Sequence, residues 1–265
     1  FLKNLGGFYL EAGSRLNLHS KYGNNFTYSI NPSFLLHESL KLFVNFGTAF
    51  RAPSLSELYG QWGPNPDLKP ESSQTLEAGL DFKSPCGKWE SRAVYFSRNT
   101  KDVITYGPKF SYINYNRQKD HGWEFESKLQ LLPSLQAKLF YSYVTGNVTA
   151  SSGGKDTTYN NLLRRPKHSG GLTLNYQVSS SFFVSSHLQV LGKRNDLYFD
   201  PVTYQSSTVQ LDPYTLWNFY AQYSLLKDKI NVFGQVNNLL NKEYYEVYGY
   251  STLKRNFSLG LRWNL

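Results

Sequence analysis

The sequence predicts an all-β fold in which antiparallel strands form a transmembrane β-barrel. Residues 253–265 alternate large apolar side chains with small or polar ones up to the last residue, and this pattern recurs along the whole chain. Aromatic residues make up 17% of the 265 residues, with 21 tyrosines, far above ordinary usage. Two-residue periodicity with an aromatic excess is typical of strands that face lipid on one side and a lumen on the other.

Composition excludes several other classes. No segment approaches the roughly 18 consecutive apolar residues of a membrane helix, and alternating strands account for the negative mean hydropathy. Cys86 is the only cysteine, so no internal disulfide framework is possible and we interpret Cys86 as a turn residue. The net charge of +9 comes from scattered Lys and Arg, which predicts no nucleic-acid partner.

Alternation and turn signals together predict about twelve strands. In chain order they cover residues 6–21, 25–36, 39–50, 73–84, 88–105, 110–131, 135–146, 167–178, 181–194, 213–225, 229–239 and 252–265. The only helical feature expected is a turn at residues 54–59.

The predicted connections alternate in length. Residues 37–39, 84–88, 132–134, 179–180 and 226–228 form tight turns, whereas 51–72, 147–166, 195–212 and 240–251 form long loops. Tight turns at one end and long loops at the other are typical of bacterial outer-membrane barrels, in which the short turns are periplasmic.

Alternation also assigns the two faces of the strands. In residues 123–131, Trp123, Phe125, Leu129 and Leu131 are expected to face lipid, and Glu124, Glu126, Lys128 and Gln130 to face inward. Residues 40–50 and 216–225 show the same pattern, with outward sets Leu40, Leu42, Val44, Phe46 and Phe50, and Trp217, Phe219, Ala221, Tyr223 and Leu225. Because unpaired buried charges are costly, the charged inner face predicts a water-filled or plugged lumen.

Three segments carry a family resemblance. FGTAFRAPSLSELYG (46–60), NPDLKPESSQTLEAGLDF (65–82) and NNLLNKEYYEVYGYSTLKRNFSLGLRWNL (237–265) resemble the C-terminal barrel half of TonB-dependent outer-membrane transporters. The resemblance implies a barrel of about 22 strands filled by an N-terminal plug. Residues 1–265 would then be the C-terminal part of one barrel domain, without the plug. The start at Phe1 and the lack of Met also suggest a processed protein or a fragment.

Within this family, LLRRPKH (162–168) and NKEYYEVYGYSTLKR (241–255) are similar to segments of cobalamin transporters. The resemblance implies a receptor in the outer membrane of a Gram-negative bacterium that imports cobalamin or another corrinoid. It also implies contact with outer-membrane lipid, with the TonB energy-coupling protein through the N-terminal part, and with a surface lipoprotein. The alternatives are a ferric-siderophore or haem receptor, which converging cationic residues in the lumen would favour, a passive twelve-strand channel closed on itself, and a surface adhesin.

Binding residues are expected in the long loops, because Tyr and Trp give large rigid contacts with a polar tip. The candidates are Tyr59, Trp62, Tyr106, Tyr198, Tyr204, Tyr248 and Tyr250. An aromatic girdle at the membrane interface would use the same residue types. Arg164 is a further candidate, since the resemblance places it at the ligand, and its alternative role is to pair with Glu124 or Glu126 in the lumen.

Catalytic, metal and cofactor chemistry is not predicted. The five histidines are dispersed, and no serine, histidine and acid occur in an order that suggests a hydrolase. Asp196, Asp200 and Asp212 could hold a hard cation, but a solvated loop is the expected structure for this segment.

Overall fold

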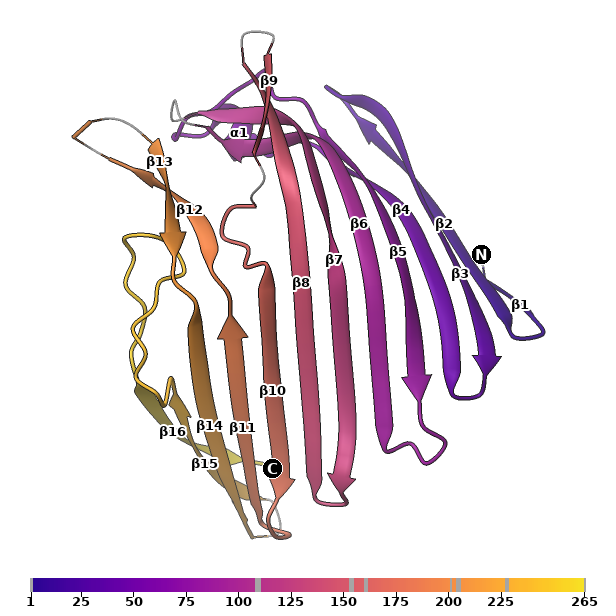
Figure 1. The fold of residues 1–265 in the computed structure, drawn as a ribbon, viewed down its shortest axis with the longest axis vertical. Helices are drawn as coiled ribbons and strands as arrows, with labels where there is room; N and C mark the ends of the chain where they lie inside the picture. The colour runs from indigo at the N-terminus through magenta and orange to yellow at the C-terminus, as the bar shows by residue number, and fades with distance from the viewer. Residues whose placement is uncertain are drawn as a thin grey trace.

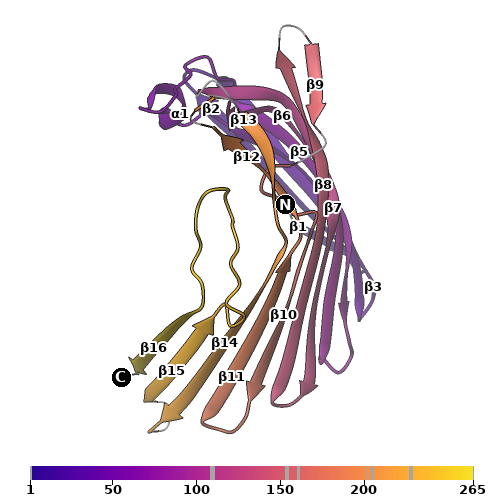
Figure 2. The same ribbon diagram turned by 60° about the vertical axis from the view of Figure 1, so that its left-hand side comes forward.

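The computed structural model describes residues 2–107, 111–152, 155–159, 162–200, 202–203, 206–226 and 229–264. Most of them belong to one curved antiparallel sheet that resembles part of a cylinder wall (Figure 1). Turning the view shows the hollow side of this sheet, with α1 and residues 238–255 lying over it (Figure 2). No helix of the described residues is long and apolar enough to cross a bilayer.

The strands follow chain order across the sheet. The elements are β1 (Leu2–Leu5), β2 (Phe8–His19), β3 (Gly23–His37), β4 (Leu40–Arg51), α1 (Leu55–Tyr59), β5 (Glu71–Lys83), β6 (Trp89–Tyr106), β7 (Tyr112–Leu132), β8 (Leu135–Ser152), β9 (Lys155–Tyr159), β10 (His168–Gln177), β11 (Phe182–Leu191), β12 (Arg194–Phe199), β13 (Ser206–Leu211), β14 (Tyr214–Leu225), β15 (Ile230–Asn237) and β16 (Asn256–Trp263). The all-β prediction is confirmed. Each predicted strand coincides with one or two of these elements.

Four predicted segments differ from the structure. The first predicted strand begins at Phe8 rather than at residue 6, because Gly6 and Gly7 adopt positive φ angles of 58° and 89° and turn the chain between β2 and β1, a short strand that was not predicted. The last strand begins at Asn256 rather than at residue 252. The loop predicted at 195–212 is a β-hairpin, β12–β13, and the loop predicted at 147–166 contains the end of β8 paired with β9.

The helical turn at residues 54–59 is confirmed as α1, and its caps explain where it starts. The Ser54 hydroxyl accepts a hydrogen bond from the Glu57 N–H, and the Glu57 carboxylate accepts one from the Ser54 N–H. This reciprocal pair satisfies two amides that a helix start leaves unpaired.

The predicted division of the two faces is confirmed by the strand register. Trp123 lies opposite Tyr95 and Tyr143, whereas Glu124 lies opposite Val94 and Ser142 on the other face. Arg51 binds Glu57 of α1, so the face that carries Arg51 is the hollow one in Figure 2. In register with it, the concave face carries Glu124, Glu126, Lys128 and Gln130. The convex face carries the predicted outward aromatic and aliphatic sets.

Opposite charges alternate across neighbouring strands of the concave face. Lys41 Nζ lies 3.3 Å from Asp81 Oδ2, and Arg92 Nη1 lies 3.2 Å from Asp81 Oδ1. Arg92 in turn lies opposite Glu126 in the register. These side chains remain partly exposed, so each pair adds little stability, and their main effect is a polar, hydrated wall.

Glycines on the concave face make room for phenylalanine rings from adjacent strands. A Cβ on Gly122 would come 2.0 Å from the Tyr143 carbonyl oxygen and 2.9 Å from the Phe96 ring. The rings of Phe43 and Phe233 lie against Gly79 and Gly260 in the same way. An aromatic ring that covers a cross-strand glycine pins the register of the two strands.

Gly122→Ala is therefore expected to destabilise the barrel by about 1–3 kcal/mol, because the backbone of β8 must shift to admit the methyl group. Urea unfolding of the complete parent protein in detergent, followed by tryptophan fluorescence, measures this. Gly47→Ala is the matched control, since its Cβ would meet nothing closer than 4.0 Å. Equal midpoints for the two variants would contradict the packing argument.

The sheet does not close on itself within the described residues. β1 pairs only with β2, and β16 pairs only with β15, so the two ends of the sheet stay apart. A passive channel built from these strands alone would need its first and last strands to pair. The open sheet disfavours that alternative.

Candidate ligand-binding site

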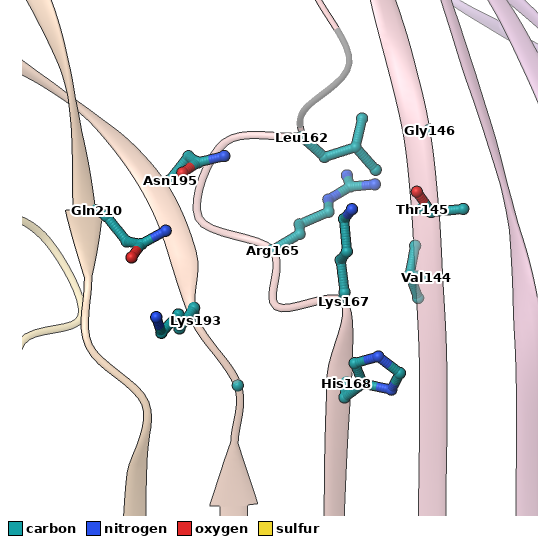
Figure 3. A pocket seen from close by; sticks show the side chains of 11 residues that line it. Val144, Thr145, Gly146, Leu162, Arg165, Lys167, His168, Lys193, Asn195 and Gln210 are labelled. Carbon is teal, nitrogen blue, oxygen red and sulfur yellow. The ribbon is translucent and has the colours of Figure 1, made fainter.

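The concave wall contains a pocket where β8 and β10 stop pairing. The β8–β10 pairing ends at Tyr143 and His168. Residues 162–167, which precede β10, lie beside β8 but are not part of the strand. The space is about 420 Å³ and is lined by Val144, Thr145, Gly146, Leu162, Arg165, Lys167, His168, Gly192, Lys193, Asn195 and Gln210. Figure 3 shows Arg165 and Lys167 reaching into it from the segment before β10.

Of the described residues that line this pocket, three are cations, Arg165, Lys167 and Lys193, and none is a carboxylate. Among the described residues, Lys167 and Lys193 form no ion pair, and Arg165 Nη1 has only Asp120 Oδ2, at 3.7 Å. Cations that lack a partner and share one concave surface create a positive potential that attracts an anion. The arrangement is suited to binding a group with several negative oxygens.

Asp120 does not neutralise this charge. Its side chain is 1% exposed and already accepts hydrogen bonds from Arg98 and from Gln118 Nε2. Arg165 also borders a second pocket of about 330 Å³, which Arg51 and Arg98 line as well. Glu71 lines this second pocket too, and Arg51 and Arg98 each pair with carboxylates, so among the described residues that line these two pockets the uncompensated cations are Lys167 and Lys193 of the first.

Asp196 joins three segments beside the pocket. It is 1% exposed, and its carboxylate accepts hydrogen bonds from Arg164 Nε at 2.7 Å, the Leu197 N–H at 2.8 Å and the Tyr248 N–H at 2.9 Å. Burial disfavours its ionised form, but the hydrogen bonds from Tyr248, Arg164 and Leu197 outweigh this and hold the pKa of Asp196 below its ordinary value. One carboxylate thus ties residues 162–165, β12 and residues 238–255 together.

Arg194 strengthens the same junction. Its Nη2 donates a 2.7 Å hydrogen bond to the Tyr245 carbonyl, and its guanidinium stacks 4.7 Å from the Tyr214 ring centroid. The side chain is buried, and Nη1 has no hydrogen-bond partner among the described residues. The Tyr198 and Tyr248 rings, 5.0 Å apart, add an aromatic contact.

The alternative role of Arg164, a pair with Glu124 or Glu126, is not found: the side chain pairs with Asp196 instead. Arg164 adopts a positive φ of 58°, and its N–H donates to the Asn195 carbonyl at 2.7 Å. This backbone turn directs the side chain toward Asp196 of β12, although 53% of that side chain stays exposed. Arg164 also lies outside the strands, four residues before β10.

The predicted aromatic residues divide into two groups. Tyr198 and Tyr248 lie at the Asp196 junction, and Tyr250 is 72% exposed on residues 238–255. Tyr59 and Trp62, at and beyond the end of α1, are strongly exposed, and Tyr106 ends β6 and contacts the Tyr112 ring at 5.2 Å. Tyr204 lies outside the described residues.

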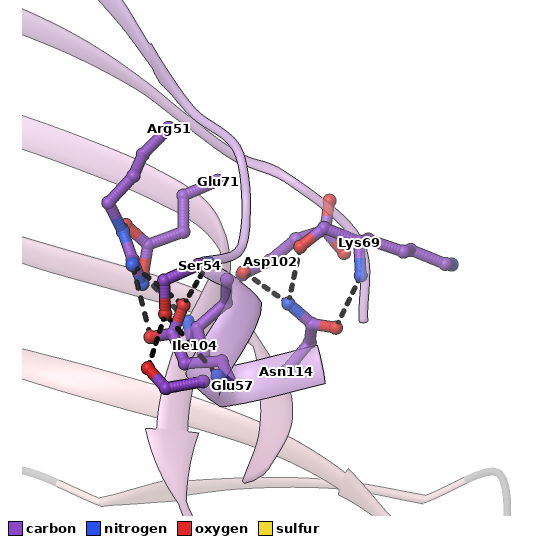
Figure 4. Close-up of polar contacts among 9 residues, drawn as sticks. Arg51, Ser54, Glu57, Lys69, Glu71, Asp102, Ile104 and Asn114 are labelled. Atoms are coloured by element: carbon purple, nitrogen blue, oxygen red, sulfur yellow. Dashed lines mark hydrogen bonds and ion pairs between the residues drawn. The ribbon is translucent and has the colours of Figure 1, made fainter. Parts of the chain in front are cut away.

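A separate polar network holds the α1 segment over the sheet. Arg51 Nε donates to Glu71 Oε2 at 2.8 Å, and Arg51 Nη1 donates to both Glu57 oxygens at 3.1 Å (Figure 4). Glu71 Oε1 also accepts a 2.7 Å hydrogen bond from the Ile104 N–H. Burial opposes ionisation of Glu57, but the Ser54 N–H and Arg51 lower its pKa overall. The loop that presents Tyr59 and Trp62 is therefore fixed at its base.

The sequence interpretation singled out Arg164 and missed Arg165, Lys167 and Lys193. LLRRPKH contains two of the missed cations, so the signal was a local concentration of bases, but only the fold brings Lys193 beside them. Among the described residues no three His, Cys, Asp or Glu side chains gather as a metal site. Asp196, a candidate cation ligand, instead binds Arg164 and two amides.

The curved antiparallel sheet and its polar concave face are those of part of a β-barrel wall. The family model "TonB dependent receptor-like, beta-barrel" matches residues 3–239. The chain belongs to this family of outer-membrane receptors, whose members are receptors and transporters rather than enzymes.

Solved structures agree with this fold. The FrpB iron transporter from Neisseria meningitidis superposes with a TM-score of 0.77 at 18% identity, covering 98% of this chain and 43% of that one. The ferric enterobactin receptor PfeA from Pseudomonas aeruginosa gives 0.76 at 19% identity, with 97% and 42% covered. Fiu from Escherichia coli K12, a ferric-catecholate import receptor, gives 0.72 at 17% identity, with 97% and 42% covered. The chain spans less than half the length of these proteins.

Proposed function

We propose that this chain is the part of an outer-membrane, TonB-dependent receptor that captures an anionic iron chelate of the siderophore class. The observation that carries the proposal is a pocket whose described lining includes Arg165, Lys167 and Lys193 but no carboxylate. Ferric siderophores built on catecholate or hydroxycarboxylate groups carry net negative charge, because the charges of their oxygens exceed that of the ferric ion. Uncompensated cations on a concave surface match that charge.

The similar structures support the same ligand class. FrpB is named an iron transporter, PfeA a ferric enterobactin receptor and Fiu a ferric-catecholate import receptor. Because their sequence identity to this chain is low, these structures indicate a shared fold but not a shared ligand. The ligand class is therefore inferred from the charge of the pocket.

Cobalamin is the second candidate, on the strength of residues 162–168 and 241–255. Its corrin ring carries mainly neutral amides and would gain less from the three cations. Arg164, the residue expected at a corrinoid, pairs with the buried Asp196 in this structure. These observations favour an anionic chelate over a corrinoid, and haem, with two propionates, lies between them.

Import by the complete protein would need energy as well as binding. Capture at high affinity makes release slow, and coupling through TonB to the inner-membrane proton gradient supplies the work for release. We infer that the parent protein contacts TonB through an N-terminal part outside these residues. A surface lipoprotein partner is expected only if the ligand is cobalamin.

Calorimetric titration of the detergent-purified complete parent protein tests the proposal. A ferric tris-catecholate siderophore, haem and cyanocobalamin are titrated separately. Submicromolar binding of the ferric siderophore, with weaker or no binding of cyanocobalamin, is the expected result. Tight cyanocobalamin binding without siderophore binding would overturn the proposal in favour of the corrinoid.

A further inference from the structure

The convex face carries a second cationic cluster, remote from the pocket. The β6–β7 register places Lys101 directly opposite Arg117 and Asn99 opposite Lys119. His121 follows on the same face of β7, because side chains two residues apart along a strand share a face. Lys101, Arg117, Lys119 and His121 are all exposed.

None of these four side chains has a carboxylate partner among the described residues. The ion pairs of the described sheet involve other cations. Asp156 on β9, which lies opposite Ser151 of β8, accepts a hydrogen bond from Asn116. Like charges directly opposite each other on adjacent strands destabilise a sheet unless a counter-ion lies between them. The Lys101–Arg117 pair therefore favours an anion at this position.

In part of β7, basic and acidic side chains lie on opposite faces of the sheet. Between residues 117 and 126, the convex side chains are Arg117, Lys119, His121, Trp123 and Phe125, whereas the concave ones are Gln118, Asp120, Gly122, Glu124 and Glu126. Every basic residue of this stretch faces outward and every acidic one faces inward. A surface that needed only solubility would mix both signs.

The cluster lies next to an aromatic row. Tyr95, Trp123 and Tyr143 are in register on the convex face, with the Tyr95 and Trp123 ring centroids 4.9 Å apart. Toward the tight turns, the same face continues with Phe125 and Leu129. Aromatic residues of a membrane barrel mark the interface, and apolar ones mark the hydrocarbon layer. Lys119, four residues beyond Trp123, then lies about 13 Å along the strand, at the level of lipid headgroups.

We propose that Lys101, Arg117, Lys119 and His121 form a binding site for the phosphate group of an anionic lipid in the membrane leaflet on the side of the long loops. The charges, the aromatic row and the depth all fit a phosphorylated headgroup with its chains lying along Phe125 and Leu129. The site depends on the membrane placement of the barrel and is independent of which ligand the concave pocket captures.

The test uses the complete parent protein and native mass spectrometry in detergent. Phosphatidic acid is the probe, and phosphatidylcholine with the same acyl chains is the uncharged-headgroup reference. The expected result is a lower apparent Kd for phosphatidic acid. Each basic residue near an anionic membrane surface is worth about a fivefold change in affinity, so Lys101→Gln with Arg117→Gln should weaken phosphatidic acid binding about 30-fold.

The matched control is Lys128→Gln with Lys138→Gln. These lysines also lie opposite each other, but on the concave face, and their loss should leave the lipid preference unchanged. Lys119→Gln alone, expected to weaken binding about fivefold, keeps the test decisive if the double variant folds poorly. An unchanged preference in the convex-face variants would overturn the proposal. Full displacement of the lipid by inorganic phosphate would also overturn it, because the site would then bind free phosphate rather than a lipid.

Discussion

Lys167→Glu combined with Lys193→Glu is expected to weaken binding of the anionic chelate by at least about 100-fold. Both lysines line the pocket and have no carboxylate partner among the described residues, so their positive charge is available to an anionic ligand. Opposed charges at a close binding contact contribute about 2–5 kcal/mol, and reversal replaces attraction with repulsion. Titration of a ferric tris-catecholate into the complete parent protein measures the change.

Two controls separate the site from general charge effects. Lys83→Glu with Lys88→Glu makes the same charge change at the tight-turn end of β5 and should leave affinity within about twofold, since exposed ion pairs contribute little. Cyanocobalamin affinity, if any, should change less than siderophore affinity in the pocket variant. Wild-type affinity for the siderophore in Lys167→Glu with Lys193→Glu would show that the pocket does not bind it.

Asp196→Ala is expected to release the three segments that border the pocket. The substitution leaves the Leu197 and Tyr248 amides without their acceptor, at a cost of about 1–3 kcal/mol. Arg164 is half exposed and regains water, so the lost ion pair adds little. Hydrogen exchange of residues 196–199 and 245–250, followed by mass spectrometry, should become about 5- to 150-fold faster.

Asp200→Ala is the matched control for this release. Among the described residues, Asp200 accepts hydrogen bonds only from Val202 and Thr203, within its own turn. Its loss should leave exchange at Tyr248 unchanged. Equal protection at Tyr248 in Asp196→Ala and the wild-type protein would refute the junction.

The lowered pKa of Asp196 predicts that the junction of the three segments depends on pH. Because the folded state lowers the pKa of Asp196 below its unfolded value, its contribution is complete above the unfolded pKa and is lost as pH falls through the folded pKa. The three segments should therefore loosen below about pH 4 and stay joined between pH 5 and 8. Asp196→Asn should remove this acid response, which exchange measured across pH, with correction for intrinsic rates, can detect.

Local patterns explain which parts of the fold the sequence could predict. Alternation of Trp123 and Glu124 assigned both faces of β7 because one residue step reverses the side of a strand. The turn expected at residues 54–59 is local as well, because Ser54 and Glu57, the two partners of its cap, lie within four residues. The same local logic indicated tight turns at one end and long connections at the other.

Contacts between distant segments explain what the sequence could not predict. Asp196 binds Arg164 and Tyr248, which are 32 and 52 residues away, so neither its burial nor its partners could follow from nearby residues. Arg164 was expected at the ligand, but its positive φ turns it toward β12. Lys193 joins Arg165 and Lys167 only because the ladder sets β11 beside β10.

The position of the bound iron tests the central claim most directly. Crystals of the complete parent protein grown with a ferric tris-catecholate siderophore would locate the metal by its anomalous scattering. The account predicts an iron peak on the concave side, with chelate oxygens within hydrogen-bond reach of Lys167 and Lys193. An ordered chelate held elsewhere, with the pocket of Arg165, Lys167 and Lys193 filled only by solvent, would contradict it.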